Sequence, residues 1–379
     1  MSMLRFVPYV GRTVRRAPVR SLLTILGTAL ALALFAFVRT LEGGVASFDA
    51  AARKPVVVVF QQSRFCPLTS ELPLRYRDAI QRLDGVEAVL PTTVFVNQCR
   101  SNLDLVVLHG VDPTTLDRVH DVAVREGDLE GWRKDASSAL VGRRLAERRS
   151  LSVGQSVQLA GMPVTVKGIV DGGGPGFDNV AFVHERALAE QREMVGLTTE
   201  FFVRLKPGAD GPRLAEQIDA LFAADQAATE TKTMQAFVQG AVSEVAEIVR
   251  FARVLGYLAV VVVVLVLSNT IFISAQTRAQ ELGTLETIGL TKERLALLVV
   301  AEGVLLAVLG GVLGTGAVVA FFTAVPTTLG VEGFGIDFVA GPGVMWAGLV
   351  ASCVVGVVAS AFPAIELALR PVASLVRPS

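Results

Sequence analysis

The sequence predicts an α-helical membrane protein with four transmembrane helices and a large mixed α+β extracytoplasmic domain inserted between helices 1 and 2. Of the 379 residues, 52% are hydrophobic and only 18% are charged, whereas an average soluble domain carries about 25% charged residues. The apolar residues gather in four runs, and each is long enough to cross a bilayer as a helix. A long segment with strand and turn patterns separates the first run from the second.

The first run, residues 21–41, follows an amphipathic N-terminal segment, residues 1–20, that holds five arginines and no acidic residue. Its apolar stretch exceeds the roughly 7–15 residues of a signal-peptide core, so we interpret it as a retained anchor. The positive-inside rule places the N-terminus in the cytoplasm. Four spans then return the C-terminus to the cytoplasm and leave the large domain outside the inner membrane.

The remaining boundaries follow from the changes in composition along the chain. We expect transmembrane helix 1 and a stalk at 21–52, the extracytoplasmic domain at 53–230, a stalk and transmembrane helix 2 at 231–275, a cytoplasmic coupling loop at 276–294, transmembrane helix 3 at 295–325, a short periplasmic loop at 326–342, transmembrane helix 4 at 343–365 and a cytoplasmic C-terminus at 366–379.

Short β-branched runs and amphipathic stretches indicate that the inserted segment folds. We expect strands at 56–60, 86–96, 103–111, 180–183 and 200–205, a hairpin over 152–170 with its turn at Gly161, and helices at 73–83, 137–149 and 212–223.

A heptad pattern precedes the second span. Its apolar positions alternate spacings of four and three residues, at Met234, Val238, Ala241, Val245 and Ile248, and the pattern continues into the span. A 3.5-residue repeat is typical of helix packed on helix, which predicts a stalk beyond the membrane. The alternative is an amphipathic surface helix on the domain.

The residues after the second span resemble the signature region of the FtsX-like permease family, the type VII ABC membrane subunits of the macrolide-exporter (MacB) and lipoprotein-release types. The matching residues are Asn269, Arg278, Glu281, Gly283, Gly289, Glu302, Gly310, Gly311 and Gly314. Residues 139–170 and 201–218 are similar to the MacB-like periplasmic domain. Glu286 and Thr287 depart from the basic residue and Ala that the family usually has.

The resemblance implies a permease subunit that transmits ATP-driven motion from a cytoplasmic ATP-binding-cassette ATPase dimer to its periplasmic domain, for export or extraction of a drug, lipid or lipoprotein. The implied partners are that ATPase, a second permease copy, membrane lipid and a periplasmic adaptor. The sequence has no G-x-x-x-x-G-K-[ST] loop, so we expect ATP and Mg²⁺ to bind the ATPase and this chain to be non-catalytic. Two alternatives are an FtsX-like regulator of a cell-wall hydrolase and a membrane-anchored sensor without transport.

The resemblance also suggests roles for single residues. The ATPase-coupling loop comprises Arg278, Glu281, Leu282, Gly283, Leu285, Glu286 and Gly289. We expect Glu281, Leu282, Leu285 and Glu286 to face the ATPase. Gly289 is expected to be a left-handed helix C-cap, and Thr291 is expected to cap the next helix.

The transmembrane signature residues are Asn269, Glu302, Gly310 and Gly314. Glu302 lies some two turns into the third span, so we expect it to snorkel or to pair rather than to bind substrate. Gly310 and Gly314 form a small-xxx-small face suited to helix packing.

Several other sites and partners have little support. The 35 basic and 35 acidic residues balance, which argues against a nucleic-acid partner. His109, His120 and His184 lack metal-ligand spacing, so no metal site is expected. Gly172–Gly176 is expected to be a mobile loop. Cys66 and Cys99 both fall in the outer domain, where an oxidising periplasm favours a disulfide between them; two free thiols are the alternative.

Overall fold

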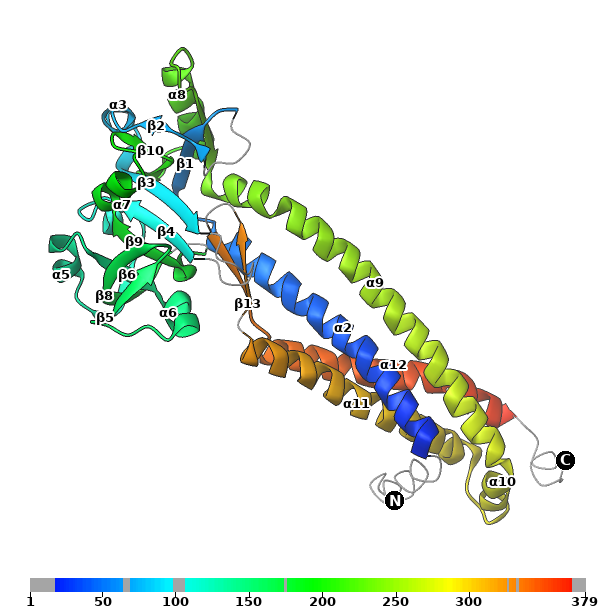
Figure 1. The fold of residues 1–379 in the computed structure, drawn as a ribbon. Coiled ribbons are helices and arrows are strands. Elements are labelled where there is room, and N and C mark those ends of the chain that lie inside the picture. The colour runs from blue at the N-terminus through cyan, green and yellow to red at the C-terminus, as the bar shows by residue number, and fades with distance from the viewer. Residues whose placement is uncertain are drawn as a thin grey trace. The chain divides into compact units, whose positions relative to one another are not determined.

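The structure is a computed structural model that describes residues 18–63, 69–97, 106–173, 176–325, 327–331 and 334–369. The chain divides into two compact units (Figure 1). We call residues 1–43, 247–325 and 339–379 the helical unit, and residues 44–246 and 326–338 the inserted domain. Cys66 and Cys99 lie outside the described residues, so their predicted disulfide stays a prediction.

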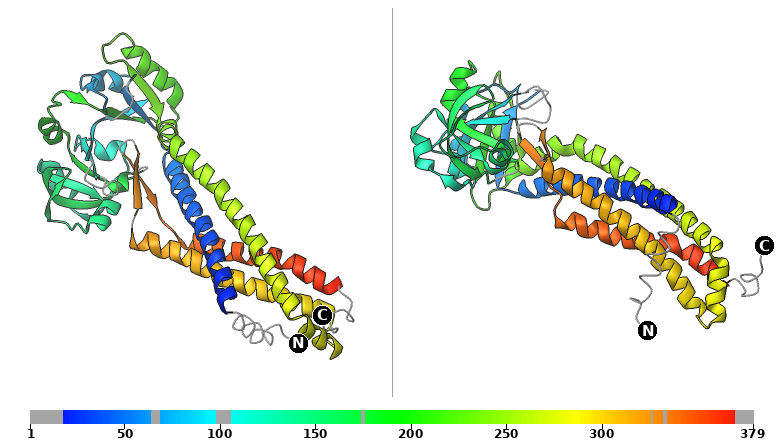
Figure 2. Two further views of the ribbon diagram at one scale, coloured as in Figure 1. Left: turned by 45° about the vertical axis from the view of Figure 1, so that its right-hand side comes forward. Right: turned by 60° about the horizontal axis from the view of Figure 1, so that its bottom comes forward.

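Four long helices carry the predicted spans. They are α2 (Pro18–Ala51), α9 (Met234–Thr277), α11 (Lys292–Ala324) and α12 (Pro342–Leu369). Each contains a segment long and apolar enough to cross a membrane, which confirms the four predicted spans. Helices α11 and α12 run side by side in every view (Figure 2), and the short helix α10 (Ala279–Thr287) connects α9 with α11.

Glycines bring the helices of the helical unit close together. A methyl group at Gly311 would lie 2.5 Å from the Cβ of Ser352, and one at Gly348 would lie 2.1 Å from Cγ2 of Thr315. Real Cβ contacts are not this short, so α11 and α12 approach closely only because these positions lack side chains. At the edge of the unit, Arg253 of α9 forms an ion pair with Glu42 of α2.

The inserted domain is built on one ten-stranded sheet within the described residues, in the order β12-β1-β11-β3-β4-β9-β6-β8-β5, with β7 also paired to β8. Its strands are β1 (Val56–Gln61), β3 (Val86–Asn97), β4 (Val106–Val111), β5 (Ala123–Gly127), β6 (Ser138–Gly142), β7 (Ser156–Leu159), β8 (Met162–Asp171), β9 (Val180–His184), β11 (Glu200–Leu205) and β12 (Thr229–Thr233). Two further pairs are β2 (Leu72–Pro73) with β10 (Leu197–Thr198), and β13 (Thr327–Val331) with β14 (Phe334–Phe338).

Short helices cover this sheet and create two hydrophobic cores. These helices are α3 (Tyr76–Gln81), α4 (Leu116–Val119), α5 (Leu129–Lys134), α6 (Arg143–Arg149), α7 (Glu185–Gln191), α8 (Gly211–Phe222) and the 3₁₀ turn η3 (Phe177–Asn179). One core lies under α3 and α8, where the Tyr76 and Phe222 rings stack with centroids 3.9 Å apart. The other lies under α6 and α7 and contains Leu145 and Leu188.

The chain enters and leaves the inserted domain through adjacent strands. β1 follows α2, and β12 precedes α9 directly. The two strands are antiparallel neighbours, with Val57 opposite Thr233.

One sequence expectation in this domain is wrong. Residues 137–149 do not form one helix, because residues 138–142 form the central strand β6, buried at every position, before α6 starts at Arg143. A fully buried strand lacks alternation and cannot be distinguished from a buried helix by periodicity. The region 326–342, expected as a short periplasmic loop, contains the β13–β14 hairpin in its described residues.

Candidate functional site

The predicted coupling residues lie on and beside α10. Leu282 is 4% exposed and packs in the apolar cluster of the helical unit, with Leu295 of α11 and Leu367 of α12. Leu285 is half-buried against the same cluster, and Gly283 is buried. The expectation that Leu282 faces a partner is therefore wrong, because the chain's own core covers it, whereas Leu285 is covered only in part.

An ion pair fixes the start of α10 to its neighbouring helices. Arg278 precedes the helix, and its Nη1 lies 3.4 Å from Oε2 of Glu302. Glu302 also accepts a hydrogen bond of 2.9 Å from Ser274 Oγ of α9. Only 14% of the Arg278 side chain and 13% of the Glu302 side chain are exposed, so most of this ion pair is removed from solvent. Glu302 is thus paired in the structure, and its contacts join α9, the residue before α10 and α11.

Gly289 closes α10 in the expected left-handed conformation. Its φ is +106°, its N–H donates to the Glu286 carbonyl at 3.0 Å, and the Leu290 N–H donates to the Leu285 carbonyl at 3.1 Å. These two bonds define a Schellman motif. Thr291 occupies the N-cap position of α11, but its side chain makes no capping hydrogen bond, so that expectation is wrong in its detail.

The exposed face of α10 is narrow and mixed in character. Glu281, Thr284 and Ile288 are exposed and follow the i, i+3, i+7 spacing of one helix face. Ile288 is 74% exposed, and Glu286 is half-buried. Sequence reasoning did not single out Ile288. Helical spacing could have identified it, because Ile288 lies six residues after the buried Leu282 and therefore on another side of the helix.

The signature glycines of α11 face α2. A methyl group at Gly310 would lie 2.7 Å from the Cβ of Thr28, and one at Gly314 would lie 2.1 Å from the Ala29 carbonyl oxygen. These close approaches are what a packing role of Gly310 and Gly314 requires.

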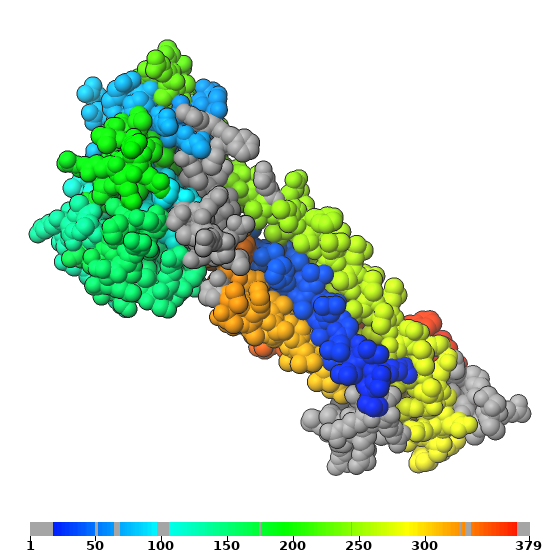
Figure 3. Space-filling view, in the orientation of Figure 1, coloured from blue at the N-terminus to red at the C-terminus, as the bar shows by residue number. Residues whose placement is uncertain are grey.

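Asn269 lies exposed on α9, the least covered of the four spans. Only 11% of the apolar window of α9 is buried, against 33–44% in the other three. Figure 3 shows α9, in yellow-green, along one side of the helical unit.

The apolar heptad positions of the predicted stalk, which we call the seam, fall into two groups. Met234 and Val238 are buried, at 1% and 0% exposed. Ala241 and Val245 are half-buried, and Ile248 is 69% exposed. Within this chain the buried positions of α9 shift to Val242 and Val249, so its own neighbours cover Ala241 and Val245 only in part and leave Ile248 exposed.

The histidines of the domain serve its packing. His120 is 3% exposed, and its ring lies 4.4 Å from that of Phe177 and 4.9 Å from that of Phe202, centroid to centroid. Burial lowers the pKa of His120 from 6.5 to about 3, so the ring is neutral at physiological pH. Among the residues that the structure describes, no three His, Cys, Asp or Glu side chains gather as metal ligands.

The glycine-rich run is anchored where it is described. The Gly172 N–H donates to Oδ1 of Asp178 at 2.9 Å, and a methyl group at Gly173 would lie 2.1 Å from the Asp121 carbonyl oxygen. The expectation of a mobile loop is therefore wrong at Gly172 and Gly173. Their missing side chains permit close backbone approach, which composition alone does not distinguish from flexibility.

Two family models match the chain over most of its length. The MacB-like periplasmic core domain matches residues 21–221, and the FtsX-like permease C-terminal domain matches residues 253–371. No curated protein matches the sequence.

Solved structures resemble the chain over about half of its length. The periplasmic region of MacB from Actinobacillus actinomycetemcomitans is 12% identical, with a TM-score of 0.37, and the match covers 49% of this chain and 92% of that one. The extracellular domain of the noncanonic ABC-type transporter YknZ from Gram-positive bacteria is 14% identical, with a TM-score of 0.36, covering 47% of this chain and 99% of that one.

Proposed function

Because this chain belongs to the FtsX/MacB-type family of ABC transporter permeases, we propose that it transmits the ATP-driven motion of a separate cytoplasmic ATPase to its extracytoplasmic domain. In this function the chain is the non-catalytic component, and the ATPase binds ATP and Mg²⁺. The motion serves export or extraction of a membrane or periplasmic substrate, which the domain engages alone or with an adaptor protein.

The observation that carries the proposal is the way α10 is held. The Arg278–Glu302 pair, the buried Leu282 and the Schellman motif at Gly289 attach both ends and the inner face of this short helix to the spans. A push on α10 therefore displaces α9 and α11 instead of bending a loop. The exposed face is then free to bind a partner protein.

Ile288 is the residue through which we propose that the ATPase docks. A side chain of this size at 74% exposure gains most when a partner's apolar pocket covers it, and a single central apolar anchor commonly dominates an interface. Glu281 and Thr284 lie on the same face and provide polar contacts around it.

Co-purification of the ATPase with the tagged full-length chain tests this proposal. Ile288→Glu is expected to lower the amount of ATPase recovered at least tenfold, since a charge replaces the apolar anchor. Val195→Glu is the matched control, because Val195 is 73% exposed and lies in the inserted domain. Recovery of the ATPase with the Ile288→Glu variant at the control level would refute the docking site. A wild-type chain that recovers no ATP-binding-cassette protein would refute the function.

We further propose that the functional unit is a homodimer in which α9 packs against α9 of a second copy. Exposed positions of the seam recur every seven residues at Ile248, Leu255 and Val262, and then at steps of four, three and four residues at Val266, Asn269 and Ile273. One Asn in an otherwise apolar seam is typical of a helix pair whose register is set by a polar contact. Lipid cannot hydrogen-bond the Asn269 amide, whereas a second helix can.

A further inference from the structure

The β13–β14 hairpin, which connects α11 with α12, is fastened to the inserted domain by Asp337. Its Oδ1 accepts hydrogen bonds from Asn179 Nδ2 at 2.6 Å and from Thr328 Oγ1 at 2.9 Å. Its Oδ2 lies 3.7 Å from Nε of Arg144 in α6. Asn179 itself is 2% exposed. Asp337 therefore joins both strands of the hairpin to η3 and α6.

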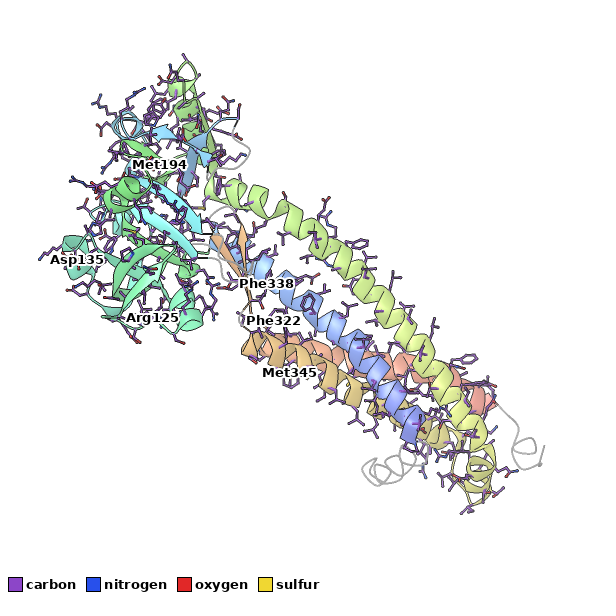
Figure 4. All side chains as sticks on the ribbon, viewed as in Figure 1. Arg125, Asp135, Met194, Phe322, Phe338 and Met345 are labelled. Carbon is purple, nitrogen blue, oxygen red and sulfur yellow. The ribbon has the colours of Figure 1, made fainter. Side chains whose placement is uncertain are left out.

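Close packing at two glycines adds to these polar contacts. A methyl group at Gly335 would lie 2.7 Å from the Cβ of Asn179, so the hairpin backbone is pressed against η3. On the other side, a methyl group at Gly44 of α2 would lie 2.6 Å from Cδ1 of Phe338, the last residue of β14. Phe338 is labelled in Figure 4. The hairpin thus contacts both η3 and the C-terminal part of α2.

The same part of the domain also holds the chain that emerges from α2. Lys54, three residues after the end of α2, donates to Oδ2 of Asp121 at 2.7 Å and to the Gly173 carbonyl. We call residues 171–179, where the structure describes them, the junction segment. Gly173 and Asn179 both belong to it, so α2 and the hairpin converge on one short stretch of chain.

The junction segment is itself fixed to the sheet. Asp171 accepts hydrogen bonds from Arg125 Nε of β5 at 2.5 Å and from Arg143 Nε of α6 at 2.9 Å, and Arg125 is labelled in Figure 4. Asp178 lies 3.5 Å from Nη2 of Arg143. A displacement delivered to this segment therefore reaches strand β5 and helix α6 through direct contacts.

We propose that the junction segment is a mechanical input to the inserted domain, at which displacement of α11 and α12, carried by the hairpin, is combined with displacement of α2. Asp337 is the positioning residue that fastens the hairpin there. The proposal rests on the function proposed above and adds a route besides the two stalk helices. Chain connectivity supports it, since the hairpin is the direct connection between α11 and α12.

Hydrogen exchange tests the fastening without any ATPase. In the full-length protein in nanodiscs, Asp337→Ala is expected to speed amide exchange of residues 334–338 roughly tenfold, because charge-assisted hydrogen bonds are lost. Asp337→Asn keeps an acceptor oxygen for Asn179 and is expected to retain most of the protection. Glu190→Ala is the matched control, since it breaks the exposed 2.9 Å pair with Arg186 elsewhere in the domain. Unchanged exchange in Asp337→Ala would overturn the fastening role.

A second measurement tests the mechanical role in the complex with the ATPase. Addition of ATP and vanadate is expected to change exchange of residues 176–184 in the wild type and in Glu190→Ala, and to change it at least fivefold less in Asp337→Ala. Equal changes in Asp337→Ala and wild type would overturn the inference and leave the proposed function intact. Failure of the wild-type chain to bind the ATPase would instead refute the proposed function, while the exchange measured without ATPase still decides the fastening.

Discussion

Nη1 of Arg278 lies 3.4 Å from Oε2 of Glu302, and this pair connects the residue before α10 with the third turn of α11. Both side chains are mostly buried. An ion pair shielded from water is stabilising only while both partners are present, because a single buried charge keeps its desolvation cost without compensation.

A double-mutant cycle should show this dependence. We expect Arg278→Met and Glu302→Leu each to lower the melting temperature more than the double variant does, with single-variant costs of roughly 3–5 kcal/mol. The measurement is Trp346 fluorescence on heating, in a Trp132→Phe background, since the sequence has two tryptophans. Additive effects in the double variant would show that the pair is not coupled.

Gly314 and Gly316 offer a matched comparison on α11. Gly314→Ala places a methyl group 2.1 Å from the Ala29 carbonyl oxygen, so α2 and α11 must separate, at a cost of roughly 1–3 kcal/mol. Gly316 has nothing within 4 Å of the same position, so Gly316→Ala should stabilise the helix by roughly 0.5–1 kcal/mol. The same fluorescence melt measures both, and equal melting temperatures would contradict the packing role.

The free energy of unfolding of the inserted domain should decrease as the pH is lowered, because of His120. Its pKa is about 3 in the folded domain and 6.5 when unperturbed, so below pH 6.5 only the unfolded chain gains the proton. The contribution is complete above pH 6.5 and is lost as the pH falls toward 3, at about 1.4 kcal/mol per pH unit. Between pH 7 and 5.5, wild type should therefore lose about 1 kcal/mol more than His120→Phe.

Trp132 reports this transition, because it is 0% exposed within the domain. The experiment uses a Trp346→Phe background, so that the helical unit does not contribute to the signal. Comparing wild type with His120→Phe at both pH values cancels the contribution of the other titrating groups to the change in stability. Parallel pH dependences would show that His120 is not the group responsible.

Cysteine cross-linking tests the proposed α9 dimer. In a chain whose native cysteines are replaced, Asn269→Cys should form a disulfide between copies in membranes, because the seam places the two residues opposite each other. The matched control restores only the native Cys353, which is exposed on α12. Equal cross-linking at both positions would indicate random collision, and absence of dimer at position 269 would refute the α9 interface.

The spans and most strands were predictable because they depend on local pattern. A run of about 20 apolar residues has few alternatives to a membrane helix, and the turn at Gly161 follows from the left-handed backbone that glycine favours, with a φ of +84°. Gly289 was predictable for the same reason.

What the pattern did not reveal was which partner covers each apolar side chain. Leu282 and Ile288 are both aliphatic residues of one short helical segment, yet the first is buried and the second is exposed. The difference depends on where α11 and α12 pass, which is a long-range property. The contact of Asp337 with Asn179 joins residues 158 positions apart, and no local pattern encodes it.

The pairing of β1 with β12 has an evolutionary consequence. Since the strands that receive the chain from α2 and return it to α9 are hydrogen-bonded neighbours, the two ends of the insertion lie next to each other. Insertions with adjacent ends are well tolerated by the domain that receives them. A membrane scaffold of this topology can therefore accept a different segment between β1 and β12, and chimaeras joined at residues 56 and 233 are the natural units for engineering it.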